Sequence, residues 1–454
     1  MPYIQNSAAD RQAMLDEIGV GSIQELFAPI PKPIQFDGEL AIDAGLTETE
    51  LKAHMETLGA ENRPAAVTGC FLGGGIYNHD WPTLVDHLSG RSEFLTAYTP
   101  YQPECSQGTL QWIYEFQSMI AEICGCEIAN ASMYDGASAC AEAALMAVGT
   151  NRRRRVVVSA GLHPHSKETV QTYLRHLDIE MVEAPLKDGA TQWNGVVDDK
   201  TAAVLVQQPN FLGVIENLDA VQEVASSNGA MSVASLYPVA AGLLRSPGQA
   251  GIDIVVGDGQ SLGVPMSMGG PSFGFFATRE KFVRKLPGRL VGISKDSKDR
   301  RAYTLTFQTR EQHIRREKAT SNICTNNALI ALRGCIHMAA LGPQGLEEVA
   351  CLSRQRTLEM VGALTQATDA LSLAFPKQSY FNEVALRAKD GAAGVQAFQN
   401  AVHEVGLQGV IRMGDWDADM ADIFTLACTE KTTDDDIARL VQAANLAFQT
   451  EVAR

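Results

Sequence analysis

The middle of the chain, from about residue 110 to 280, alternates between two hydrophobic periods. An uninterrupted apolar run at Val156–Val158 is typical of a buried strand, and apolar residues then recur with helical spacing from Val170 to Leu177. Three more apolar runs, AAVLVQQPN, AMSVAS and DIVVGD, predict strands, and a helical face from Leu218 to Ala225 follows the first of them. Buried strands separated by helices form parallel sheets covered on both faces. The pattern therefore predicts an α/β fold.

The two ends of the chain carry different patterns. Residues 1–60 predict helices interrupted by closely spaced prolines, which is an arm rather than a domain. Residues 61–340 carry the α/β pattern and form the predicted large domain. Beyond the step at Gly342-Pro343, strands at FNEVALRA and DIFTLAC and a last helix after TTDDD predict a smaller α+β domain over residues 341–454.

Composition and charge narrow the function. Among the 454 residues, 37 are Lys or Arg and 53 are Asp or Glu, so the formal charge is 37 − 53 = −16. An acidic protein of this kind lacks the basic surface that nucleic acid binding requires. We expect no membrane segment, because no apolar run approaches the roughly 18 residues that one needs. The nine cysteines are scattered and contain no CxxC pair, so we expect no metal site. The N-terminal residues are acidic and lack the apolar stretch of a signal peptide, which predicts a cytoplasmic protein.

The densest group of polar and aromatic residues is YTPYQPECSQG, residues 98–108. Prolines hold this segment extended, so that it can present side chains without helical periodicity. An ordinary loop rarely carries such stiffening, and we expect the segment to line a site. The chemical groups that it would present are the phenols, carboxylate and amide of Tyr98, Tyr101, Glu104 and Gln107.

Two other segments could bind an anion. In the first, basic residues from Arg310 to Lys318 precede Thr320, Ser321 and Asn322, a pattern that suits a phosphate or a charged interface; the alternative is a helix capped by Thr320 or Ser321. In the second, a helix is predicted to begin at Asp135 directly after a strand. Its free amides could hold an anion, or Asp135 could simply cap the helix.

Several long motifs carry a resemblance to a known family. They are MLDEIGVGSIQELF, FLGGGIYNHDWP, EFLTAYTPYQPECSQGTLQWIYEFQSMI, MYDGASACAEAALMA and TREQHIRREKATSNIC. Together they resemble the decarboxylating P-protein of the glycine cleavage system, and more narrowly its subunit 1, the N-terminal half found where the P-protein is split into two chains. The resemblance extends from residue 1 to the C-terminus. It implies the fold-type I architecture of pyridoxal phosphate enzymes, with a mainly parallel large-domain sheet and a small C-terminal domain.

An enzyme of this type needs a lysine that holds the cofactor as a Schiff base. The chain has no lysine between Lys200 and Lys281, where the fold would place it. By rough alignment with the cofactor-bearing half, the expected position falls near Gln260 or Ser261. We therefore expect this chain not to hold the cofactor covalently.

The acid expected beside the pyridine nitrogen falls near Ala234 or Ser235 and is also missing. The resemblance then implies a partner, subunit 2, that supplies the lysine in an active site shared between the two chains. It also implies that the assembled enzyme decarboxylates glycine and passes the aminomethyl group to the lipoyl arm of the H-protein.

Within that shared site the resemblance assigns roles to residues of this chain. We expect Tyr98, Tyr101 and Glu104 to position glycine and the cofactor ring, with His79 and Gln107 as weaker candidates. Thr320, Ser321 and Asn322 would donate hydrogen bonds to the cofactor phosphate across the interface. Two alternatives are a self-sufficient pyridoxal phosphate enzyme, such as an aminotransferase or desulfurase, which the missing lysine opposes, and a structural or regulatory pseudoenzyme.

Overall fold

A computed structural model describes residues 5–36 and 38–448. The chain forms two compact units, Met1–Arg63 and Pro64–Arg454. The first unit holds helices α1 (Ala8–Ile18) and α2 (Glu48–Gly59), each begun by a capping box, and the 3-10 turns η1 (Ile23–Phe27) and η2 (Lys32–Ile34). Leu15 is the one side chain that is buried among the described residues of this unit.

The second unit is built around a seven-stranded sheet with the order β1-β9-β8-β7-β6-β2-β3. Its four pairings from β8 through β7, β6 and β2 to β3 are parallel, whereas β9 pairs antiparallel with both β8 and β1. The strands are β1 (Ile128–Ala129), β2 (Arg155–Ser159), β3 (Glu180–Ala184), β6 (Thr201–Gln208), β7 (Met231–Leu236), β8 (Ile254–Asp258) and β9 (Gly274–Thr278). The mainly parallel sheet that the apolar runs predict is confirmed.

Alternate residues of these strands enter two separate cores, one on each face of the sheet. Val157 packs with helices α6 (Gln107–Cys124) and α9 (Leu218–Ser227) and the first part of α11 (Ala328–Ala367). Its neighbour Val156 packs on the other face with α7 (Gly136–Asn151) and α8 (Pro164–Leu174). Both faces are covered, and this explains why the strands read as continuous apolar runs.

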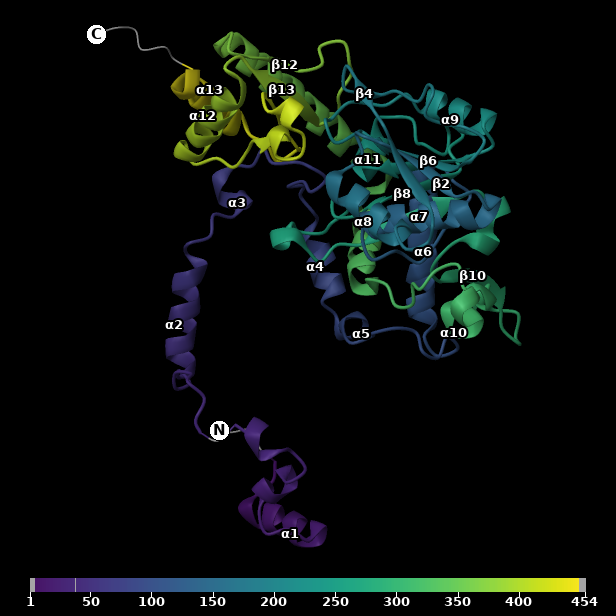
Figure 1. Ribbon diagram of the computed structural model, residues 1–454, viewed down its shortest axis with the longest axis vertical. Helices are drawn as coiled ribbons and strands as arrows, with labels where there is room; N and C mark the ends of the chain where they lie inside the picture. The colour runs from purple at the N-terminus through teal and green to yellow at the C-terminus, as the bar shows by residue number, and fades with distance from the viewer. Residues whose placement is uncertain (1–4, 37, 449–454) are drawn as a thin grey trace. The chain divides into compact units, whose positions relative to one another are not determined.

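A smaller four-stranded antiparallel sheet, β12-β13-β15-β14, forms the C-terminal domain with its own core. Figure 1 shows β12, β13, α12 and α13 grouped together, apart from the central strands β2, β6 and β8. The elements are β12 (Leu371–Leu373), β13 (Glu383–Ala388), α12 (Gly391–Glu404), β14 (Ile411–Arg412), β15 (Ile423–Ala427) and α13 (Asp434–Phe448).

Helix α11 joins the two domains and changes direction at its middle. Gly342 leaves the helical conformation with φ 63° and ψ −177°, and Pro343 follows it. Residues before this step, such as Leu332, pack in the large-domain core, and residues after it, such as Leu364, pack in the small-domain core. The predicted break at Gly342-Pro343 is therefore present.

Short elements complete the second unit. They are α3 (Ala65–Thr68), α4 (Thr83–Ser89), α5 (Ser92–Leu95), β4 (Leu186–Lys187), β5 (Ala190–Thr191), η3 (Pro238–Gly242), η4 (Ser267–Gly269), η5 (Glu280–Lys285), β10 (Leu290–Lys295), β11 (Arg301–Thr306), η6 (Gln308–Arg310), α10 (Gln312–Arg315), η7 (Arg316–Lys318), η8 (Met413–Asp415) and η9 (Ala418–Met420). None of the helices in the described ranges has the length and apolar character that crossing a bilayer requires.

Candidate active site

The turn after strand β8 holds Gln260 and Ser261, the residues nearest to the expected position of the cofactor lysine. Gln260 is 4% exposed, and its side chain bonds the backbone of the glycine-rich loop 71–80. Its Oε1 accepts from the Tyr77 amide at 2.9 Å, while its Nε2 donates to the carbonyls of Tyr77 at 3.1 Å and Val264 at 2.8 Å. Two of these bonds anchor the loop, and the third stays within the turn that follows β8.

The first amide of helix α7 is hydrogen-bonded to a carboxylate, that of Asp258. Asp258, the last residue of β8, accepts from the Gly136 amide at 3.1 Å through Oδ2 and from the Gln260 amide at 2.9 Å through Oδ1. Asp135 caps the same helix by accepting from the Ser138 amide at 2.7 Å. Of the two alternatives for this helix start, capping is the one that the structure shows.

A carboxylate at this position works against a bound phosphate. Burial raises the pKa of Asp258, and the bonds from Ser272, Gln260 and Gly136 act in the opposite direction by favouring the charged form. The Gly136 amide, which could have bound an external anion, is thus bonded to the Asp258 carboxylate. Neither Gln260 nor Ser261 has the amine that a Schiff base with pyridoxal phosphate needs, so the residues of this turn do not fit a covalently held cofactor.

A buried polar network joins the glycine-rich loop to the small domain. The Tyr77 hydroxyl donates to Glu383 at 2.7 Å, and the amide of Gly74 donates to both oxygens of that carboxylate, at 3.0 and 3.1 Å. A Cβ on Gly73 would lie 2.7 Å from the Glu383 carboxylate, so the close approach requires glycine. Burial raises the pKa of Glu383, and the hydrogen bonds from Tyr77, Gly74 and the Thr425 hydroxyl oppose that shift.

His79 lies at the other end of the same loop. Its Nδ1 lies 2.7 Å from a Glu430 oxygen, and its Nε2 is hydrogen-bonded to the Tyr237 hydroxyl. The His79 ring is 5% exposed. It is therefore enclosed between both domains, in a network separate from residues 98–108.

Sequence reasoning missed Tyr77, Tyr237, Glu383 and Glu430 as members of this network. The signal that could have found it is FLGGGIYNHDWP itself, since three successive glycines indicate close backbone packing. The partners lie about 160 to 350 residues away along the chain, and no local pattern identifies them.

Tyr98 and Tyr101 lie together on the surface. Their rings are 67% and 79% exposed, and the ring centroids are 6.3 Å apart. The Tyr98 hydroxyl lies 3.2 Å from the Thr325 hydroxyl, which connects the segment 98–108 to the segment that holds Thr320. The structure thus brings two of the predicted sites next to each other.

The other two predicted residues of segment 98–108 differ in their surroundings. Glu104 is exposed. Gln107 is half-buried, and it bonds the backbone of Tyr303 in both directions: its Oε1 accepts at 2.8 Å and its Nε2 donates at 2.9 Å. Gln107 therefore fixes strand β11 against helix α6.

The alternative for this segment, a helix capped by Thr320 or Ser321, is wrong. Helix α11 begins eight residues beyond Thr320, at Ala328. The Ser321 hydroxyl accepts from the Ile323 amide at 3.1 Å, which closes a local turn in place of a helix cap. Thr320 and Ser321 are half-buried and line a small pocket with Arg310, whereas Asn322 is exposed.

A buried glutamate lies behind this segment. Glu142, in the middle of helix α7, is 2% exposed, and its Oε2 has no hydrogen-bond partner among the described residues. Burial raises the pKa of Glu142 to about 7, and a hydrogen bond from Ser321 partly opposes the shift.

Comparison with known proteins gives consistent matches over the whole chain. A model of the family "Glycine cleavage system P-protein" matches residues 1–444. The probable glycine dehydrogenase (decarboxylating) subunit 1 of Geotalea daltonii is 44% identical over 449 residues, which cover 98% of this chain and 99% of that protein.

Solved structures agree with these matches. A crystal structure of glycine decarboxylase (P-protein) of the glycine cleavage system, in inhibitor-bound form, is 42% identical with a TM-score of 0.89, and the match covers 98% of this chain and 100% of that one. A sphingosine-1-phosphate lyase from Burkholderia pseudomallei is similar in fold alone, at 12% identity and a TM-score of 0.66 over 93% of this chain and 94% of that one. The fold is that of fold-type I pyridoxal phosphate enzymes.

Proposed function

The chain belongs to the glycine cleavage system P-protein family, and from this premise we propose that it completes a pyridoxal phosphate site whose cofactor is held by a second, related subunit. It is a subunit of glycine decarboxylase. With its partner it decarboxylates glycine, and the aminomethyl group passes to the lipoyl arm of the H-protein. Pyridoxal phosphate supplies the electron sink for such a decarboxylation.

The observation that carries the proposal is that the side chains of the turn after β8 are hydrogen-bonded within the chain. Gln260 is bonded to the backbone of Tyr77, and Asp258 is bonded to the first amide of helix α7. Either feature alone would disfavour the cofactor, since the first leaves no amine for a Schiff base and the second gives the first amide of helix α7 an internal acceptor in place of a phosphate. Both together support a division of labour in which subunit 2 holds pyridoxal phosphate.

Tyr98 and Tyr101 support a contribution of this chain to the partner's site. Large aromatic rings exposed on a stiff segment are typical of surfaces that another chain covers, and they lose little entropy when they are covered. In the proposal Tyr98, Tyr101 and Glu104 orient glycine and the cofactor ring. Their apolar parts exclude water from the reacting carbon.

The segment 320–322 would serve the phosphate in the same shared site. The Thr320 hydroxyl and the Asn322 amide are small donors, and the Ser321 hydroxyl would join them by turning away from Glu142. The contact between Tyr98 and Thr325 connects their segment to the aromatic pair. Neutral donors of this kind can bind a phosphate without bringing an additional charge.

His79 and Gln107 have indirect roles in this account. Gln107 connects the aromatic segment, at the Pro103 carbonyl, to β11, and His79 fixes loop 71–80 between the domains. The substrates of the assembled enzyme are glycine and the lipoylated H-protein. A reducing compartment such as the cytoplasm fits nine cysteines that are all unpaired.

The experiment uses the assembled two-subunit enzyme with Tyr101→Phe or Glu104→Gln in this chain. We expect glycine-dependent exchange of carbon dioxide to fall at least tenfold in each variant, because misplaced reactants lose that much rate. Glu115→Gln, at an exposed position of helix α6, is the control and should retain full activity. Size-exclusion chromatography checks that all variants assemble. Assembled variants with unchanged exchange would favour the pseudoenzyme.

A further inference from the structure

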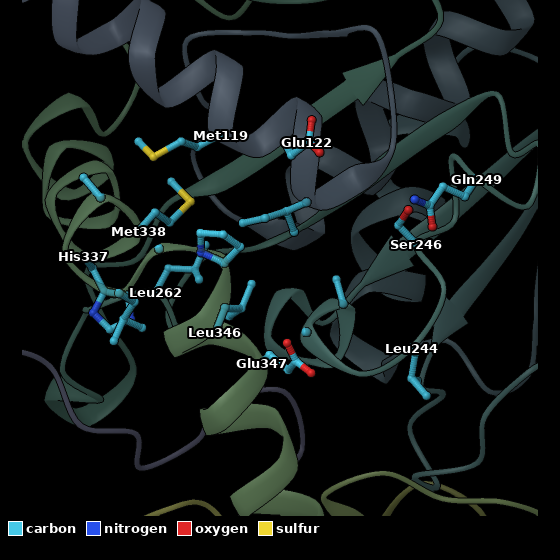
Figure 2. A pocket seen from close by; sticks show the side chains of 17 residues that line it. Met119, Glu122, Leu244, Ser246, Gln249, Leu262, His337, Met338, Leu346 and Glu347 are labelled. Atoms are coloured by element: carbon cyan, nitrogen blue, oxygen red, sulfur yellow. The ribbon is translucent and has the colours of Figure 1, made fainter.

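A cavity in the second unit lies beside the break in helix α11. Its volume is about 570 Å³, within the usual range for a site that binds a small molecule. Helix α6, the turn η3, the loop 244–249 and both parts of α11 form its walls (Figure 2). The cavity shares no lining residue with the aromatic segment 98–108 or with loop 71–80.

The walls are mostly apolar. Two thioethers, Met119 and Met338, line the cavity with Leu262, Pro343 and Leu346. Thioether side chains adapt to the shape of a ligand and contact apolar groups favourably. The apolar lining indicates that a ligand would place a hydrocarbon or aromatic body here.

Two buried polar side chains interrupt the apolar lining. Ser246 is 6% exposed and His337 is 4% exposed, and both line the cavity. The Ser246 Oγ and the His337 Nδ1 have no hydrogen-bond partner within the described ranges. In Figure 2 the two residues lie on opposite sides of the drawn cavity. A buried polar atom without a partner is costly, and a ligand that bonds it would recover that cost.

The charges around the cavity select against anions. Glu122 and Glu347 line it as exposed residues, and no lysine or arginine is found among its lining residues in the described chain. Burial lowers the pKa of His337 to about 4, so the imidazole is neutral at physiological pH. The cavity thus presents neutral hydrogen-bonding groups inside and negative charge outside.

We propose that this cavity is a binding site for a neutral or cationic amphipathic small molecule, distinct from the glycine site. The apolar body of the ligand packs against Met119, Met338 and Leu346, and its polar group bonds Ser246 or His337. Since the two parts of α11 belong to different cores, a ligand at the break contacts the element that joins both domains.

The test titrates the assembled two-subunit enzyme with the neutral fluorescent probe Prodan, which has an aromatic body and a carbonyl acceptor. We expect saturable binding with a blue-shifted emission. Ser246→Ala should weaken it about fivefold, the value of one hydrogen bond. Ala339→Trp should abolish binding, because Ala339 lines the cavity, whereas Ala340→Trp changes the adjacent exposed residue outside it and should bind normally.

Competition tests the charge preference with ligands of matched length. We expect 1-decanol and decylamine to displace Prodan at least fivefold more effectively than decanoate does. Equal binding to the two tryptophan variants would overturn the site, and so would Prodan binding to the isolated chain but not to the assembled enzyme. Equal displacement by decanoate would overturn the charge selection. Glycine exchange in Ala340→Trp reports the glycine site separately.

Discussion

Glu142 makes the stability of the large domain depend on pH in a direction opposite to that of most carboxylates. Its pKa is about 7 in the folded chain and 4.5 as the ordinary value. Between these two values the unfolded chain loses a proton that the folded chain keeps, so stability falls as pH rises. The difference of 2.5 pKa units corresponds to about 3 kcal/mol of stability. This stability is lost between pH 4.5 and pH 7, and the loss is complete above pH 7.

Replacement of the acid by its neutral isostere removes this cost. We expect Glu142→Gln to stabilise the chain by up to about 3 kcal/mol at pH 8. It should change stability little at pH 4.5, where the carboxyl is neutral in the folded chain and only half ionised in the unfolded chain. Glu168→Gln changes an exposed glutamate of helix α8 and is the matched control. Ser321→Ala removes the hydrogen bond that lowers the pKa, and should increase the loss of stability at high pH.

Thermal unfolding of the four proteins across this pH range is the assay. The reasoning predicts a difference between Glu142→Gln and the unaltered chain that grows from pH 4.5 to pH 7 and is constant above it. Infrared spectroscopy at pH 6 should show a protonated carboxyl band that Glu142→Gln lacks. A difference that does not vary with pH, or one that Glu168→Gln reproduces, would refute the reasoning.

Two further substitutions test the packing around loop 71–80. Gln260→Leu leaves the amide and carbonyl of Tyr77 unpaired and should destabilise the large domain by about 3 kcal/mol in chemical denaturation. A loss of about 0.5 kcal/mol or less, as for a substitution on the surface, would contradict the anchoring role. Gly213→Ala should cost at least 2 kcal/mol, because φ is +80° and its Cβ would lie 2.2 Å from the Glu383 carbonyl oxygen. Gly195→Ala has a similar φ with open space around it, and should cost only about 1 kcal/mol; equal costs would rule out the steric reason.

Much of the fold could be predicted because its determinants are local. The apolar runs that became β2, β6, β7 and β8 are buried on both faces, so that consecutive residues such as Val156 and Val157 are both apolar although they enter different cores. The break in α11 is likewise local, since Gly342-Pro343 interrupts the helical hydrogen bonds.

The contacts that form the site depend on residues far apart in the sequence. Tyr77 and Glu383 are separated by 306 positions, and nothing near either residue identifies the other. The alternative of a helix that begins at Thr320 or Ser321 is wrong for a different reason. The Ser321 hydroxyl bonds its own neighbour, and the Asn327 amide donates to the carbonyls of Tyr134 and Ser272, which holds the segment extended.

The central claim is that the cofactor is held by the partner subunit while both chains are needed for turnover. The most direct measurement is borohydride reduction of the assembled enzyme with pyridoxal phosphate, followed by peptide mapping of both chains. The account predicts a labelled lysine on the partner alone, and glycine-dependent exchange of carbon dioxide only when both chains are present. A labelled lysine on this chain, or exchange by this chain alone, would contradict it.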